Sequence, residues 1–155
     1  MKKTMMAMAV AMMALLSCLT AQAQDLDELI APGKKVFVEV VDVKETLELA
    51  DEIKDCKELT ADQFDWKVVD TKDEADFVLQ LSMWRKKMIG FPRCYMKPAI
   101  LLPDGTEVWE GKELKGDANE FNGFRATVAA YWAFVKSVKK DKAFAPAVKD
   151  NNKKK

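Results

Sequence analysis

The sequence contains no histidine in 155 residues, and this absence excludes several classes of catalytic site. Without an imidazole the chain cannot build a Ser-His-Asp or Cys-His nucleophile system, and it has no histidine to bind a metal ion. Beyond residue 23 only two serines remain, Ser82 and Ser137, and neither lies in a nucleophile-elbow motif. The sequence also lacks the glycine-rich motifs that bind phosphate groups. We therefore expect a protein that is not an enzyme and has no cofactor and no bound metal.

Acidic residues are abundant, and a pair of carboxylates alone can hydrolyse a glycosidic bond. A carboxylate-based hydrolase is therefore an alternative, and it predicts a cleft with paired acids, one of them with a raised pKa. One acidic group is expected to form the solvated surface of a helix, and it comprises Glu45, Glu48, Asp51, Glu52 and Asp55. A second group of acids and amides crowds one loop without the spacing of an EF-hand, and it comprises Asp117, Asn119, Glu120 and Asn122. We expect loop and capping roles for this second group, with Asn122 as the helix cap.

The first 23 residues have the three parts of a cleavable secretory signal. Lys2 and Lys3 supply the positive start, residues 5–16 form an apolar run, and residues 21–23 read Ala-Gln-Ala, a pattern that signal peptidase accepts. A transmembrane helix needs about 20 apolar residues, and this run is shorter. The sequence therefore predicts an exported protein that is periplasmic or secreted.

A second processing route is open within the same segment. Residues 15–18 read Leu-Leu-Ser-Cys, which resembles the lipobox at which lipoprotein signal peptidase cleaves before a lipid-modified cysteine. Cleavage there would leave Cys18 as an acylated N-terminus and the protein as an outer-membrane lipoprotein, held by more than one acyl chain. Cleavage after Ala23 would leave a free protein that begins near Gln24. Both alternatives predict that the mature protein lies outside the cytoplasm, beyond the inner membrane.

The charge is balanced overall but unevenly distributed. Removal of the two lysines of the signal leaves 23 basic and 25 acidic residues, a net charge of −2, which gives no indication of nucleic acid as a partner. Residues 136–155 hold eight lysines and two aspartates, so they carry +6 and residues 24–135 carry −8. We expect one domain over residues 24–144 and a basic, disordered tail over residues 145–155. Such a tail could solubilise the protein or touch anionic lipid or a polyanion.

Two cysteines, Cys56 and Cys94, follow the signal. An oxidising compartment permits a bridge between them, which would close a loop of 39 residues and stabilise the fold by about 4 kcal/mol. The alternative is two buried free thiols, and the sequence leaves both open. Two cysteines without histidine do not make a zinc site.

Hydrophobic periodicity predicts five strands and two long helices. The strands are expected over residues 34–43, 66–70, 76–88, 94–102 and 107–114, and the helices over 45–59 and 123–140. Residues 71–74 fit a capping box and predict one helical turn. Pro98 lies within a strand and requires a bulge or an unpaired stretch opposite it. The order β-α-β-β-β-β-α predicts a two-layer α+β sandwich, in which two helices cover one face of a mostly antiparallel sheet of about five strands.

Three stretches carry a resemblance to known proteins, and they are residues 74–79, 102–109 and 115–124, which read EADFVL, LPDGTEVW and KGDANEFNGF. They resemble small uncharacterised exported proteins of Gram-negative bacteria, many of them grouped only as domains of unknown function. The element order is more loosely similar to lipopolysaccharide-assembly lipoproteins and to the N-terminal domain of the Tol-system β-propeller protein. These motifs are strand starts and turns, so the resemblance implies a scaffold or adaptor role in the envelope by analogy and assigns no functional residues.

The most suggestive surface is the hairpin between the strands over 76–88 and 94–102. Its candidate binding residues mix cations with large apolar side chains, and they are Trp84, Arg85, Lys86, Lys87, Met88, Ile89, Phe91 and Arg93. Such a tip could enter a membrane interface, stack on a polyanion or anchor in a partner's groove. The alternative is a hairpin whose apolar residues fold back on the sheet. Trp66 and Trp109 are expected to pack in the core or on a face of the sheet, and the alternative is that they form platforms for carbohydrate.

The leading hypothesis is a non-catalytic envelope protein that binds another protein or an envelope component. A second hypothesis is a secreted effector or ligand-binding protein whose basic tail and hairpin contact membrane or polyanion, and salt should weaken such contacts. The carboxylate-based hydrolase is the third. The oligomeric state is left open by the sequence.

Overall fold

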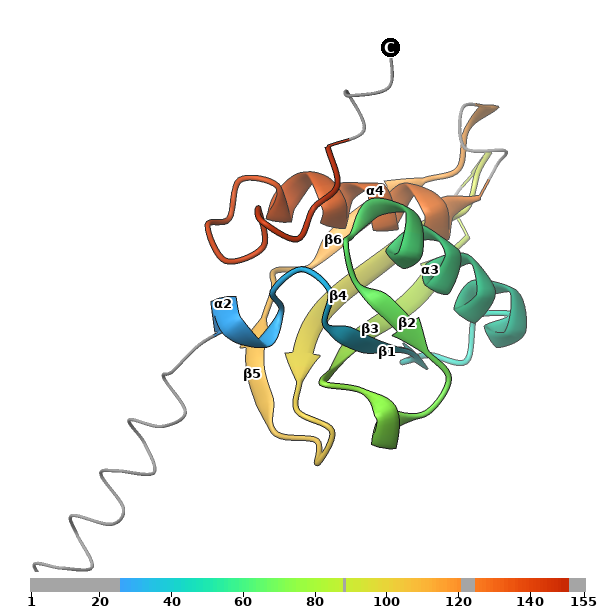
Figure 1. Ribbon diagram of the computed structural model, residues 1–155. Helices are drawn as coiled ribbons and strands as arrows, with labels where there is room; N and C mark the ends of the chain where they lie inside the picture. The colour runs from blue at the N-terminus through green and yellow to red at the C-terminus, as the bar shows by residue number, and fades with distance from the viewer. Residues whose placement is uncertain (1–25, 88, 121–124, 151–155) are drawn as a thin grey trace, which may run out of the picture.

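The computed structural model describes residues 26–87, 89–120 and 125–150 (Figure 1). The predicted signal with Cys18, the hairpin residue Met88 and the predicted cap Asn122 lie outside these residues. Within the described ranges, no helix has the length and apolar character needed to cross a membrane.

A six-stranded sheet forms one layer of the molecule. Its strands are β1 (Lys35–Asp42), β2 (Lys67–Val69), β3 (Phe77–Lys86), β4 (Arg93–Leu101), β5 (Glu107–Glu110) and β6 (Leu114–Asp117). They lie in the order β2-β1-β3-β4-β5, and β6 also pairs with β4. The pairings of β1 with β2 and β3 are parallel, whereas β4 is antiparallel to β3, β5 and β6.

The second layer consists of two long helices, α3 (Leu49–Gln63) and α4 (Ala126–Val138), which lie on the same face of the sheet (Figure 1). A short helix, α2 (Leu26–Leu29), precedes β1, and a single 3-10 turn, η1 (Lys72–Glu74), connects β2 to β3. The turn predicted from the capping box is therefore present, although the Thr71 side chain makes no capping hydrogen bond. The predicted α+β sandwich is confirmed.

Pro98 lies where the pairing along one side of β4 is interrupted, as the sequence predicted. The single strand expected over residues 107–114 is instead two strands, β5 and β6, separated by residues 111–113. The Gly111 amide donates to the Pro98 carbonyl over 2.8 Å, so this side of Pro98 faces the gap between the two strands. Because proline has no amide proton to offer there, an uninterrupted ladder could not form.

Helix α3 begins four residues later than the periodicity predicted, at Leu49 instead of Glu45. The Asp42 carboxylate accepts hydrogen bonds from the backbone amides of Lys44 and Leu47, which folds the intervening chain into a loop. Glu45 has a φ of +53°, in the left-handed region that a helix cannot contain. The loop of residues 43–48 therefore carries the chain from β1 to α3.

An aromatic cluster between the layers forms much of the core. Trp66 stacks on Phe64 with ring centroids 4.2 Å apart, and its indole nitrogen donates to the Ile30 carbonyl over 2.7 Å. Trp109 packs against Phe144 at 4.7 Å. Trp66 is buried and Trp109 half-buried, so both tryptophans contribute to the core as expected.

The packed chain extends beyond residue 144, where the sequence placed the start of a disordered tail. Ala147 is fully buried, and Val148 forms a β-bridge with Phe64. The Lys149 amide donates to the Gln63 carbonyl over 2.8 Å, and its ammonium group donates to the Ala61 carbonyl. The prediction was wrong for residues 145–149, because burial of a few small apolar side chains needs no helical or strand periodicity. Residues 151–155 lie outside the described chain.

Candidate functional site

The hairpin between β3 and β4 holds its apolar tip in solvent. Lys86 pairs with Arg93 at the last rung of the ladder, and Gly90 takes a φ of +106° in the turn. Beyond that rung the Ile89 side chain is completely exposed, and Phe91 is 55 % exposed. The described apolar residues of the tip are therefore not buried against the sheet, which was the alternative to a binding role.

The stem of the hairpin is fixed by contacts on the outer face of the sheet, the face opposite to α3 and α4. Trp84 stacks on Tyr95 across the two strands at 5.2 Å, and the Lys44 ammonium lies 5.0 Å from the Trp84 ring centroid. Arg93 forms an ion pair with Asp117 of β6. The hydrogen bond from Arg93 holds the pKa of the Asp117 carboxyl below its usual range. Trp84 and Arg93 are thus committed to contacts within the protein.

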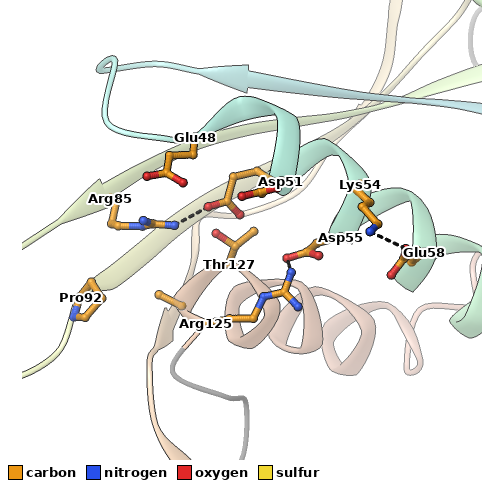
Figure 2. Close-up of a pocket in the computed structure, with 11 residues that line it drawn as sticks. Glu48, Asp51, Lys54, Asp55, Glu58, Arg85, Pro92, Arg125 and Thr127 are labelled. Carbon is orange, nitrogen blue, oxygen red and sulfur yellow. Dashed lines mark hydrogen bonds and ion pairs between the residues drawn. The ribbon is translucent and has the colours of Figure 1, made fainter.

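On the helix side, a cleft of about 430 Å³ lies at the base of the same hairpin (Figure 2). Its lining residues come from the loop before α3, from α3, from the hairpin and from the start of α4, and they are Glu48, Asp51, Glu52, Lys54, Asp55, Glu58, Arg85, Pro92, Arg125, Ala126 and Thr127. Five of these side chains are acidic and three are basic, a net charge of −2. The cleft therefore joins the hairpin stem to both helices.

Two arginines reach α3 from different elements and bind its acidic residues (Figure 2). Arg85 of β3 donates to Glu52, and Arg125, directly before α4, pairs with Asp55. The prediction that Glu52 and Asp55 belong to a solvated surface was wrong, because they are only 5 % and 8 % exposed. Buried carboxylates require such partners, since an unpaired charge would be costly to desolvate.

The strand pattern contained a signal for this arrangement. The buried face of β3 follows every second residue through Phe77, Leu79, Leu81 and Met83, and the next position is Arg85. Alternation therefore directs Arg85 toward the helices, where its half-buried guanidinium pairs with an acid. Its backbone amide is also held, by the Thr46 hydroxyl at 2.8 Å. The Nε atom of Arg85 is buried and has no hydrogen-bond partner among the described residues.

Cys56 and Cys94 are free thiols in the structure, both fully buried, so of the two alternatives the structure contains the unbridged one. Burial raises the pKa of the Cys94 thiol to about 11 and raises the pKa of Cys56 further. The nearby Glu52 carboxylate acts in the same direction on both. Thiols that stay protonated are poor nucleophiles and poor metal ligands.

The loop around Asp117 shows no metal centre in its described part. Asp117 is occupied by Arg93, and no cluster of three or more potential metal ligands occurs in the portion of the chain that the structure describes. The role expected of Asn122 stays a prediction, since that residue lies outside this portion.

Comparison with known proteins finds only solved structures of low similarity. No family model matches the chain, and no curated protein matches it. One similar solved structure is a PelC dodecamer from Paraburkholderia phytofirmans, with a TM-score of 0.49, 16 % identity, and coverage of 70 % of this chain and 88 % of that one. Another is the uncharacterized lipoprotein B from Nitrosomonas europaea, with a TM-score of 0.41, 14 % identity, and coverage of 73 % and 79 %. At these values neither neighbour identifies a function, and the resemblance to envelope proteins noted from the sequence stays a prediction.

Proposed function

We propose that this chain is an exported, non-catalytic binding module of the bacterial envelope, which contacts its partner through the β3–β4 hairpin. The observation that carries the proposal is the exposure of Ile89 and Phe91 at the end of a well-fixed stem. Water-exposed apolar side chains at a projecting tip are typical of contact sites for proteins or membranes. The signal-like residues 1–23 support the envelope as the compartment.

The stem is held from both faces of the sheet, and this favours a binding role. Arg85 binds Glu52 on the helix face, while Trp84 stacks on Tyr95 on the outer face. A loop that is already ordered loses less conformational entropy when it binds than a flexible one. The stem that carries the tip is therefore already fixed to the fold.

The arrangement of acids in the cleft supports the hypothesis of a non-catalytic protein over that of a carboxylate-based hydrolase. The two buried carboxylates, Glu52 and Asp55, are each ion-paired with an arginine. Both carboxylates are thus occupied by guanidinium groups of the protein itself, whereas the two carboxylates of a glycosidase must flank the scissile bond. Glu52 and Asp55 therefore have a structural role that links α3 to the hairpin and to the start of α4.

The proposal is tested by site-specific photo-crosslinking in the native cell. The photoreactive residue replaces Ile89, and the control replaces Lys140, which is exposed beyond the end of α4 and far along the chain from the hairpin. We expect an adduct with a defined envelope protein or lipid from position 89, no such adduct from position 140, and loss of the adduct when Phe91→Ser is added.

The proposal would be overturned by no adduct from position 89, by the same adducts from both positions, or by an adduct that persists with Phe91→Ser. An adduct between two copies of the chain would identify the hairpin as a self-association surface, which contradicts binding to a separate partner. Hydrolysis of a glycoside that is abolished by Glu52→Gln would establish the third hypothesis instead.

A further inference from the structure

We infer that the partner of the hairpin is an anionic lipid surface, into which Ile89 and Phe91 insert while Lys86 and Lys87 contact the headgroups. This inference rests on the proposed function and names the partner of the same site. It is carried by the position of the four side chains. The lysines end the stem and enter the turn, and the apolar side chains follow within the tip.

The two lysines are available for an external partner. Both are exposed, and neither forms an ion pair or hydrogen bond with any residue of the described chain. By contrast, Arg85 and Arg93 in the same hairpin are bound to Glu52 and Asp117. Lysines next to an apolar tip keep their ammonium groups at headgroup level while their stems accompany the apolar residues inward. An anionic surface attracts each such charge within about a Debye length.

The charges around the hairpin determine which way it would face. On the outer face, Lys44 lies over Trp84, and Lys115 is exposed opposite Tyr95 in the ladder between β6 and β4. On the helix face, the cleft carries a net charge of −2. An anionic surface would therefore attract the tip and the outer face and repel the cleft, which orients the molecule tip first.

The apolar residues favour a membrane over a soluble polyanion. A polyanion would need the lysines but would gain nothing from a fully exposed isoleucine at the extreme end of the turn. A bilayer interface uses both, because transfer of the apolar side chains and attraction of the lysines act together. A membrane and a soluble polyanion are thus distinguished by whether binding requires the Ile89 and Phe91 side chains.

The test measures partition of the purified protein onto lipid vesicles by co-sedimentation. The full chain is expressed with Cys18→Ser, so that no acyl anchor can form, and is recovered after export. Vesicles contain phosphatidylcholine alone or phosphatidylcholine mixed with phosphatidylglycerol. We expect binding to the mixed vesicles, little binding to the neutral ones, and a steep decrease from low to physiological ionic strength.

Two double variants separate the contributions of charge and of apolar contact. Lys86→Gln with Lys87→Gln should lower the partition coefficient about fivefold for each lysine. Ile89→Ser with Phe91→Ser should lower it by at least about tenfold. The matched controls are Lys139→Gln with Lys140→Gln, and Trp132→Ser, which changes an exposed aromatic residue of α4; neither should change the partition coefficient.

Several outcomes would overturn the inference. They are equal binding to neutral and anionic vesicles, no binding to either, or equal losses in the controls. Loss of binding with the lysine variant but not with the Ile89 and Phe91 variant would indicate a purely electrostatic contact of the kind a polyanion makes. If vesicles fail to bind while position 89 still crosslinks to an envelope protein, the lipid inference fails and the proposed function stands. If both experiments fail, neither stands.

Discussion

A hydrogen bond between α3 and α4 gives the sharpest test of the helix layer that frames the cleft. The Tyr131 hydroxyl and the Thr60 hydroxyl are 2.6 Å apart, and both side chains are fully buried. The Thr60 hydroxyl also donates to the Cys56 carbonyl over 2.6 Å. Because a threonine hydroxyl has one proton, Tyr131 is the donor in the bond between the helices. Burial raises the pKa of the Tyr131 hydroxyl, so this proton is retained throughout the neutral range.

Because Tyr131 is the donor, removal of its hydroxyl and removal of the Thr60 hydroxyl should lower the free energy of unfolding by different amounts. Tyr131→Phe leaves Thr60 with its bond to the Cys56 carbonyl, so the loss should be about 1 kcal/mol, the net value of one hydrogen bond. Thr60→Val keeps the shape of the side chain but leaves the buried Tyr131 hydroxyl without an acceptor, which should cost about 2–3 kcal/mol. In the double variant no hydroxyl is left unpaired, so it should be more stable than Thr60→Val alone.

The assay is urea unfolding of the three variants and the parent protein, followed by circular dichroism. The midpoint of unfolding should rank parent, Tyr131→Phe, double variant and Thr60→Val from highest to lowest, with an unchanged slope. A double variant that is less stable than Thr60→Val, or equal losses in the two single variants, would refute the assigned donor and the contact between the helices.

Three further predictions concern other parts of the core. A Cβ on Gly116 of β6 would lie 2.0 Å from the Ala130 backbone nitrogen. Gly116→Ala should therefore destabilise the protein by about 3 kcal/mol in urea unfolding. Parent-like stability of this variant would contradict the close contact between β6 and α4. Cys56 and Cys94 should react with Ellman's reagent only after unfolding, and the absence of two thiols in the unfolded, unreduced protein would show a bridge. Folding raises the pKa of the Cys94 thiol from 9.0 to about 11, so the stability that depends on the protonated thiol should be complete below pH 9 and lost as the pH rises to about 11. Cys94→Ala should therefore lose less stability than the parent protein between these two pH values. An identical pH dependence of the two proteins would exclude this contribution of Cys94.

Local sequence patterns predicted the parts of the fold in which neighbours along the chain determine structure. Periodicity over residues 76–88 predicted the long strand β3, and Pro98 identified where the pairing along β4 is interrupted, because a missing amide proton acts at one position. The start of α3 was missed because the Asp42 side chain, and not hydrophobic periodicity, organises the loop before it.

The cleft could not be predicted from periodicity because its chemistry depends on distant pairs. Glu52 and its partner Arg85 are 33 residues apart, and Asp55 and Arg125 lie still farther apart in the sequence. The face of α3 that packs on the sheet therefore contains acids and a threonine where the helical pattern leads one to expect only apolar residues. An acidic helix face is interpreted as solvated until the arginines that neutralise it are placed.

The ion pairs of the cleft also explain how an apolar tip can stay in solvent without collapsing onto the protein. On the helix side, the stem presents the charged pair of Glu52 and Arg85. On the outer side Trp84 is already covered by Tyr95 and Lys44. The Ile89 side chain is completely exposed in the described chain, so its burial requires a second surface. This requirement favours an external partner for the hairpin, because an exposed isoleucine gains free energy only where water is excluded.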